Sequence, residues 1–393
     1  MRKKLIYTVT ISLMAFFALQ IMGAESQPTE QGAGGARGTR GGGRGGRGGR
    51  GQVQFDPAAE ARVEQLGSRG VGIHDPSTIV KCKDEYWIFY TGNGVPSYYS
   101  KDLVTWQRGP QVITTAPDWL SQVVPPRGSR GGRGGGGGGG NRGFGSRVPS
   151  FWAPDVIHFK DKYLLYFSYS SFGVNTSGIA LATNPTLDPN DPQYKWTEQG
   201  LVITSDANDD YNTIDPAVIA DQEGNLWMSF GSFWSGIKLI QLDPETGKRI
   251  PDSPMYSLAS YDSIEASFIY YHDGYYYLFL DWGMCCRGVN STYNMRVGRS
   301  KKITGPYLDK EGKDLLDRGG SLLLETDGAF IGPGHPGIIK VDDNYLLGMH
   351  FYNGARNGAS QYAIRPLEWD KDGWPYVVTP PTETEASTQT PAQ

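Results

Sequence analysis

A short pattern that occurs five times constrains the fold of this 393-residue chain more than any other feature. In each copy a turn containing Asp, Asn or Gly leads into a run of aromatic and aliphatic residues, at positions 83–90, 160–167, 223–230, 272–279 and 342–349. Such runs, bounded by turn residues, are typical of β-strands. Between Phe55 and Thr379 no amphipathic pattern extends beyond two or three helical turns, so the chain is predicted to be all-β.

A second type of segment lies about ten residues before each aromatic strand and carries a polar group beside small or apolar residues. The five segments are His74–Ser77, Ala153–Val156, Ile214–Ala217, Ile264–Ser267 and Gly334–Gly337. Each segment, with its turn and aromatic strand, forms one hairpin. Five hairpins in series predict a five-bladed β-propeller, in which every blade contributes its innermost strand to a central channel.

The polar residues of these segments would then converge on the channel: Asp75, Asp155, Asp215, Glu265 and His335. The alternative is that Asp-Pro pairs only start turns, as we expect at Asp188-Pro189 and Asp243-Pro244. Recurrence at the same place in every repeat favours convergence, because turns alone need not all carry Asp, Glu or His.

Carboxyl groups gathered in a narrow channel cannot all keep ordinary pKa values, so some of them stay protonated. Hydrolysis of a glycosidic bond needs such a mixture, namely a carboxylate that activates water and a carboxylic acid that protonates the leaving oxygen. A third carboxylate can raise the pKa of the acid. The chain also has ten Trp and 23 Tyr, and those near the channel mouth are suited to stacking on sugar rings.

The charge distribution excludes one class of partner. Two tracts, Gly32 to Gly51 and Arg127 to Arg147, hold ten Arg and 24 Gly without any acidic residue. Without these tracts and the first 31 residues, the chain has 24 basic and 39 acidic residues. Such an acidic body argues against a nucleic-acid surface and suits a neutral or cationic partner.

The chain ends and the Gly/Arg tracts predict segments outside the folded body. A basic start and the apolar stretch Leu5–Gly23 predict an export signal over residues 1–24, with a retained membrane anchor as the alternative. Residues 25–54 are predicted to be a disordered Gly/Arg-rich tether, 127–147 a disordered insertion and 380–393 a disordered tail. The propeller is assigned to residues 55–379. Behind an export signal, a solvated linker is favoured over RNA binding for the tracts.

An ordered set of motifs adds a family resemblance. The motifs are Gly72–Ser77, Phe151–Val156, Tyr169–Gly173, Asn175–Thr183, Ile214–Ala217, Ile264–Ser267, Cys285–Gly288, Ser291–Tyr293, Val297–Ser300 and Gly332–Gly337. In this order they resemble glycoside hydrolase family 43 and, within it, the endo-acting α-1,5-L-arabinanases. The resemblance covers Val71 to Trp369 apart from the Gly/Arg insertion.

The resemblance implies a role for each central residue. Asp75 corresponds to the general base, Glu265 to the general acid and Asp215 to the residue that modulates the acid's pKa. Family members invert configuration, which requires about 6.5–9.5 Å between the carboxyl groups of base and acid. His335 matches a histidine that helps to hold a central hydrated calcium ion, and its alternative role is a neutral core histidine. Calcium prefers oxygen ligands, so we expect a weak site, and no organic cofactor is expected.

Six further residues are predicted to bind substrate: Asp155, Trp152, Phe172, Asn175, Ser177 and Arg287. Alternatives remain for four of them. Asp155 could instead hydrogen-bond the backbone, Asn175 and Ser177 could only form a turn, and Arg287 could brace its loop.

Two neighbouring features receive no substrate role. His74 is predicted to pack away from the channel, because side chains alternate along a strand. Cys285 and Cys286 are adjacent, so a disulfide between them would be strained. Their redox state stays open, with Cys82 as an odd third cysteine.

Together these features predict an exported, monomeric, inverting endo-arabinanase that acts on arabinan, a side chain of plant cell-wall pectin, in the periplasm or outside the cell. Neither nucleic acid nor membrane is an expected partner, except through an uncleaved signal. An exo-acting α-L-arabinofuranosidase or a β-xylosidase on the same fold is the first alternative, and the run Cys285–Gly288 favours the endo enzyme. A carbohydrate-binding propeller without catalysis is the second.

Overall fold

The computed structural model describes residues 56–123 and 148–381. The predicted export signal, tether and Gly/Arg insertion, and the predicted tail beyond residue 381, lie outside the described residues. Within those ranges no helix is long and apolar enough to cross a membrane.

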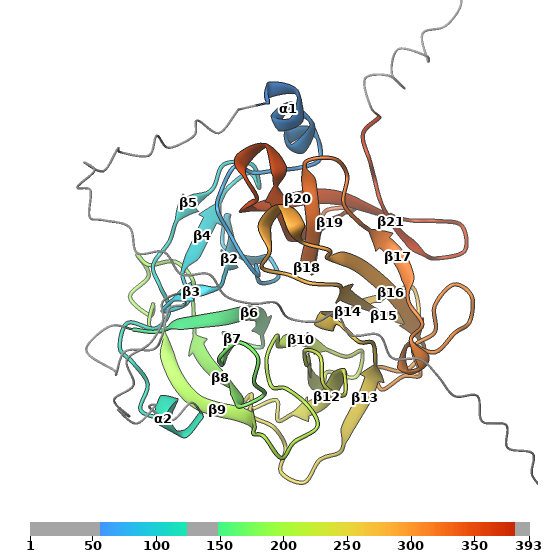
Figure 1. Ribbon diagram of the computed structural model, residues 1–393. Helices are drawn as coiled ribbons and strands as arrows, with labels where there is room; N and C mark the ends of the chain where they lie inside the picture. The colour runs from blue at the N-terminus through green and yellow to red at the C-terminus, as the bar shows by residue number, and fades with distance from the viewer. Residues whose placement is uncertain (1–55, 124–147, 382–393) are drawn as a thin grey trace, which may run out of the picture. The chain divides into compact units, whose positions relative to one another are not determined.

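Five antiparallel sheets surround a common centre, as Figure 1 shows, and the prediction of a five-bladed propeller is confirmed. Blade one has β1 (Val80–Cys82), β2 (Glu85–Phe89), β4 (Ser97–Ser100) and β5 (Gln107–Arg108). Blade two has β6 (Ser150–Phe159), β7 (Lys162–Tyr169), β8 (Ser177–Asn184) and β9 (Thr197–Ser205), with β3 (Gly92–Asn93) beside β6. Blade three has β10 (Ala217–Ala220), β11 (Leu226–Phe230), β12 (Ile237–Leu242) and β13 (Met255–Ala259).

The last two blades follow the same order. Blade four has β14 (Ile264–His272), β15 (Tyr275–Trp282), β16 (Asn294–Ser300) and β17 (Ser321–Leu324). Blade five has β18 (Phe330–Val341), β19 (Asn344–Asn353), β20 (Ala359–Trp369) and β21 (Pro375–Val377). The described helices are short: α1 (Pro57–Gln65), α2 (Leu120–Val123) and the 3-10 turns η1 (Gly288–Asn290), η2 (Leu315–Asp317) and η3 (Gly354–Arg356).

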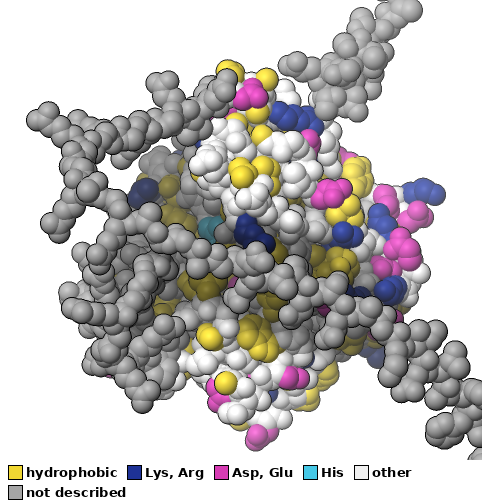
Figure 2. All heavy atoms as spheres, in the orientation of Figure 1, with side chains coloured by type: hydrophobic (Ala, Val, Ile, Leu, Met, Phe, Trp, Pro, Cys, Tyr) yellow, Lys and Arg dark blue, Asp and Glu magenta, His cyan; other side chains and the backbone are white. Residues whose placement is uncertain are grey.

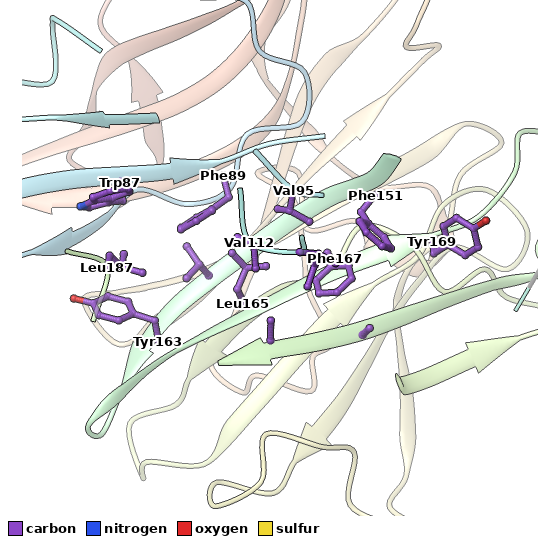
Figure 3. Close-up of a cluster of buried hydrophobic side chains, with 14 of the residues drawn as sticks. Trp87, Phe89, Val95, Val112, Phe151, Tyr163, Leu165, Phe167, Tyr169 and Leu187 are labelled. Carbon is purple, nitrogen blue, oxygen red and sulfur yellow. The ribbon is translucent and has the colours of Figure 1, made fainter. Parts of the chain in front are cut away.

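The aromatic strands have no polar face because each blade packs between two neighbours. On β7, Leu165 and Phe167 join the core shared with blade one, whereas Leu164 and Tyr166 join the core shared with blade three. Figure 3 shows the first of these cores, where side chains of β2 and β7 point toward one another. Since alternate side chains of a strand face opposite sides, both sets must be apolar.

The described N-terminal segment joins the last blade to the first. The backbone of residues 67–71 pairs with β20, since Ile364 N–H donates to the Gly67 carbonyl (3.0 Å) and Tyr362 N–H to that of Val71 (3.0 Å). Helix α1 adds the Glu60 carboxylate, which pairs with the Arg356 guanidinium at 2.7 Å. In some propellers one blade takes a strand from each end of the chain, but the described sheets of blades one and five share no strand. The contacts of residues 67–71 and of α1 therefore help to connect the two ends of the ring.

Candidate active site

Each blade has one residue with left-handed backbone within its innermost strand or shortly before it. The five residues and their φ angles are Asp75 (48°), Ala153 (42°), Asp215 (58°), Ala266 (51°) and His335 (60°). Such angles are uncommon for residues other than glycine, and they interrupt the alternation of side chains. The strand register shifts at these places in blades two, four and five.

These left-handed residues separate two cavities along the channel. The residues directly before them, His74, Trp152, Ile214 and Glu265, line a cavity of about 1260 Å³ together with Asp75 and Asp215. Residues that follow them line a much smaller cavity of about 10 Å³. The large cavity receives side chains from all five blades, and its size suits an oligosaccharide rather than a single sugar. Figure 2 shows a histidine and hydrophobic side chains in a recess near the middle of one face.

Asp75 is held in an environment that favours its ionised form. Its Oδ1 lies 2.8 Å from His74 Nδ1, and its Oδ2 accepts a hydrogen bond from Thr91 Oγ1 at 2.7 Å. Burial alone would raise the pKa of Asp75. The neighbouring imidazoles, His74 foremost and then His335 and His350, outweigh burial and hold this pKa well below its usual value.

Glu265 is buried and has the opposite tendency. Ser232 Oγ lies 2.6 Å from its Oε2, and the Tyr293 hydroxyl contacts its Oε1. Burial, opposed by the Ser232 hydrogen bond and reinforced by the charge of Asp75, raises the pKa of Glu265 to about 7. The cavity therefore contains one carboxyl group that ionises easily and one that keeps its proton near neutral pH.

Asp215 lies beside this pair, and its Oδ2 accepts the N–H of Ala266, the residue after Glu265 (3.2 Å). Burial and the charges of Glu265 and Asp75 raise the pKa of Asp215 well above its ordinary value. The contact places Asp215 against the backbone that carries Glu265, and the charge of Glu265 is one cause of the raised pKa of Asp215.

The predicted substrate residues divide into two groups. Trp152, Phe172 and Arg287 line the large cavity, and the Phe172 side chain is 80% exposed beside the Trp152 ring, with 4.8 Å between ring centroids. Ser177 is fully buried, where it donates to Asn212 Oδ1 at 2.6 Å. Asn175 Nδ2 donates to three carbonyls of the loop 206–211. These contacts favour the structural alternative for Asn175 and Ser177.

Asp155 also differs from its predicted place at the substrate. It follows the left-handed residue Ala153, so it lines the small cavity, and its two oxygens accept N–H groups from Thr78 and Val218 at 2.9 Å each. Burial raises its pKa to about 6 against these hydrogen bonds. Asp155 thus ties blades one, two and three together at the centre, and the backbone-bonding alternative is the one that the structure favours.

The prediction for His74 is wrong. Because Asp75 has left-handed backbone, alternation fails there and His74 lines the large cavity beside Asp75. Its ring stacks on His350, with 4.2 Å between centroids. Its Nε2 lies 2.8 Å from the Tyr352 hydroxyl.

Several polar neighbours were not identified from the sequence: Thr91, Ser232, Asp281, Tyr293, His350 and Tyr352. Most of them share one signal. In each hairpin, a residue in the second half of the blade's second strand pairs with the polar segment of the first strand. Glu265 pairs with Asp281 in this way, and Gly334 with His350. Polar residues about 16 positions after each first-strand motif would have revealed them.

Cys285 and Cys286 form a disulfide bond in the loop between β15 and η1. Both residues line the large cavity with Met284, Arg287 and Gly288. Cys82 is buried and free in blade one. The loop that carries the arabinanase-like motif is thus part of the cavity wall.

The residues around His335 do not by themselves form a calcium site. Burial lowers the pKa of this imidazole, so it is neutral, and its Nδ1 lies 3.6 Å from Asp75 Oδ1. The one described cluster with metal-ligand spacing is His74, Asp75 and His350, which offers two nitrogens and one oxygen. Calcium takes six to eight oxygen ligands, so water would have to supply most of them.

A propeller whose axial cavity joins an easily ionised carboxyl group to one that retains its proton has the arrangement of a glycoside hydrolase. Comparison with known proteins agrees. The chain belongs to glycosyl hydrolases family 43, whose model matches residues 71–375.

Similar proteins cover most of the chain. The extracellular exo-α-(1→5)-L-arabinofuranosidase of Cellvibrio japonicus is 39% identical over 79% of this chain and 88% of its own. The extracellular endo-α-(1→5)-L-arabinanase 1 of Bacillus subtilis is 38% identical over 82% of this chain and 92% of its own. The structure of the Cellvibrio cellulosa α-L-arabinanase complexed with arabinohexaose matches with a TM-score of 0.70 and 38% identity, over 81% of this chain and 98% of that one. The protein is therefore a glycoside hydrolase.

Proposed function

We propose that the protein is an exported enzyme that hydrolyses internal α-1,5-L-arabinofuranosidic linkages of arabinan with inversion of configuration. The observation that carries this proposal is the pairing of an ionised Asp75 with a Glu265 whose pKa is raised to about 7, in one cavity lined by all five blades. The relatives named as extracellular arabinan-cleaving enzymes support the substrate and the export.

In the proposed reaction, Asp75 accepts a proton from a water molecule, and the water oxygen attacks the anomeric carbon. Glu265 donates its proton to the glycosidic oxygen as the carbon–oxygen bond breaks, which releases the leaving sugar as an alcohol. Attack and departure occur on opposite faces, so the configuration inverts. Asp75 then holds the proton taken from water while Glu265 is ionised, and proton exchange with solvent restores both groups.

The residues beside the pair have supporting roles in this proposal. Asp215 helps to orient the acid by accepting the N–H of Ala266, the next residue, and Ser232 fixes its carboxyl group through a 2.6 Å hydrogen bond. Trp152 and Phe172 offer aromatic faces to sugar rings, and Arg287 offers hydrogen-bond donors to hydroxyl groups.

The test is the product profile of the purified protein on linear debranched arabinan, with an aryl arabinofuranoside and xylan as parallel substrates. Falling viscosity together with arabino-oligosaccharides is the expected result, and both must vanish in Glu265→Gln but persist in the matched variant Glu368→Gln on the exposed side of β20. The anomeric configuration of the first product, followed by NMR, tests inversion.

Exo action is a second candidate, because the 39% identical Cellvibrio japonicus relative is named an exo-enzyme. Free arabinose without a fall in viscosity, or rapid cleavage of the aryl glycoside, would replace the endo proposal with this one. Cleavage of xylan or an aryl xyloside would indicate a β-xylosidase. Binding of arabinan without turnover would indicate a carbohydrate-binding propeller.

A further inference from the structure

The loop that carries the disulfide contacts the proposed base through two side chains. Cys286 is exposed at the cavity wall, and its backbone N–H donates to the Tyr352 hydroxyl oxygen at 2.7 Å. The Tyr352 oxygen lies 2.8 Å from His74 Nε2, and His74 Nδ1 lies 2.8 Å from Asp75 Oδ1. A continuous line of hydrogen bonds therefore runs from the peptide between the two cysteines to Asp75.

The hydrogen bonds of Tyr352 determine which nitrogen of a neutral His74 carries the proton. Because the Tyr352 oxygen accepts the Cys286 N–H, its own proton is available to His74 Nε2. A neutral His74 then carries its proton on Nδ1 and donates it to Asp75, and a charged His74 donates it as well. Stacking on His350, with ring planes 23° apart, fixes the imidazole from its face. The His74 ring is thus held on one face by His350 and at Nε2 by Tyr352, while its Nδ1 hydrogen-bonds Asp75.

We infer that His74 is a positioning residue for the proposed base, and that the Cys285–Cys286 disulfide holds it in place through Tyr352. This inference rests on the proposed function of Asp75. It makes hydrolysis sensitive to the oxidation state of a bond at the cavity wall. A dithiol reductant would convert the disulfide to two thiols by transfer of two electrons and two protons and would itself become a disulfide. The Cys286 peptide would then be free to leave Tyr352.

The variant Tyr352→Phe removes the hydroxyl from this line and keeps the ring. We expect kcat to fall roughly 10- to 100-fold, the range for losing a hydrogen bond that orients a charged group. KM should change little, because the line of hydrogen bonds ends at the proposed base and not at the substrate. Wild-type enzyme reduced with dithiothreitol and the variant Cys285→Ser/Cys286→Ser should show the same change.

The other groups that act on Asp75 stay in place in these variants, so they do not cause the fall in kcat. They are His335 on β18, His350 on β19, Thr91 after β2, and the carboxyl groups of Asp215, Glu265 and Asp281.

Three controls separate the explanations. Cys82→Ser, which removes the buried free cysteine, should respond to the reductant as the wild type does. Tyr352→Phe should change less on reduction than the wild type does, because only the contact of Cys286 Sγ with His74 Nε2 (3.8 Å) then remains. Since the nitrogen of an Asn side chain can take the place of His Nδ1, His74→Asn should retain more activity than His74→Ala.

Two results would overturn the inference. An unchanged kcat in Tyr352→Phe and in the reduced enzyme would show that His74 does not depend on this line. A raised KM at unchanged kcat would make Tyr352 and the disulfide contacts of the substrate instead. By contrast, full hydrolysis by Asp75→Asn would refute the proposed function itself, so the two failures are distinguishable.

Discussion

At the residue scale, the difference between Asp75 and Glu265 comes from their neighbours rather than from their chemistry. Three imidazoles face Asp75, whereas hydroxyl groups and another carboxyl group face Glu265. Against the effect of burial, the charge of Asp75 raises the pKa of His74, so this imidazole can supply a positive charge that a hydroxyl cannot. Two similar acids therefore acquire opposite tendencies in one cavity.

The pH dependence of hydrolysis follows from these directions. Glu265 must be protonated to act as the acid, so kcat/KM should fall as pH rises through about 7, the pKa of this group. The base is active when ionised, so the acidic limb should lie below the usual range of an aspartate. A pH–rate profile on arabino-oligosaccharides checks both limbs. A basic limb above pH 9 would contradict the assignment of Glu265.

Glu265→Gln should lower kcat on arabinan by about 10²–10⁴, the usual contribution of general acid catalysis. The dinitrophenyl glycoside of an arabino-oligosaccharide has a leaving group that departs without a proton, so the variant should hydrolyse it nearly as fast as the wild type does. Equal losses on both substrates would show that Glu265 acts in some other way. Glu368→Gln is the matched control for the substitution.

His335 allows a prediction about calcium. Because the described side chains offer few oxygen ligands, we expect calcium to bind with a Kd of about 10⁻⁴ M or weaker. Calorimetry on protein treated with a chelator measures this affinity directly, with His335→Gln as the comparison. One calcium per chain retained through dialysis against the chelator would contradict a weak site.

At the element scale, the hairpin repeat was sufficient to predict the five blades, because aromatic runs of this kind are buried on both faces of a propeller sheet. The same repeat could not place every polar side chain. The motif puts Asp75, Asp215 and His335 on the left-handed residue itself, Glu265 one residue earlier and Asp155 two residues later. A shift of one or two residues at a bulge decides which cavity a side chain enters, and nothing in the spacing of the repeat encodes it.

The segment that connects the ends of the ring supplies a test of the fold. Gly67 has a φ of 95°, and a Cβ there would lie 2.3 Å from the Ile364 carbonyl oxygen. Gly67→Ala should therefore lower the free energy of unfolding by about 1–3 kcal/mol, because it forces residues 67–71 away from β20. Denaturant unfolding followed by tryptophan fluorescence measures the change.

Gly70→Ala is the matched control for this substitution. Gly70 also has a positive φ, of 68°, but a Cβ there would meet no atom within 4 Å. Gly70→Ala introduces the conformational strain of a positive φ without a steric clash. It should therefore lower the free energy of unfolding by less than Gly67→Ala does. Equal losses in the two variants would mean that the contact with β20 does not stabilise the ring.

At the scale of the whole molecule, the buried acids of the active site lower the free energy of unfolding of the propeller at neutral pH. Glu265, Asp215, Asp155 and Asp281 are buried acids whose pKa values are raised, so each resists ionisation in the folded chain. The folded state then binds more protons than the unfolded state above about pH 4, and their contribution to stability falls as pH rises. The buried imidazoles of His335 and His350, with lowered pKa values, act in the opposite direction.

The difference between wild type and Glu265→Gln isolates one of these acids. An unfolded glutamate titrates near pH 4.5 and the folded Glu265 at about 7, so the destabilisation by this group develops between these values and is complete above pH 7. At pH 4 both side chains are neutral and the two proteins should be similarly stable. At pH 8 the variant should be more stable by on the order of 1–3 kcal/mol. Denaturant unfolding at both pH values measures this difference. A difference that does not change with pH would mean that Glu265 ionises as easily in the folded chain as in the unfolded one, and the pairing on which catalysis depends would be absent.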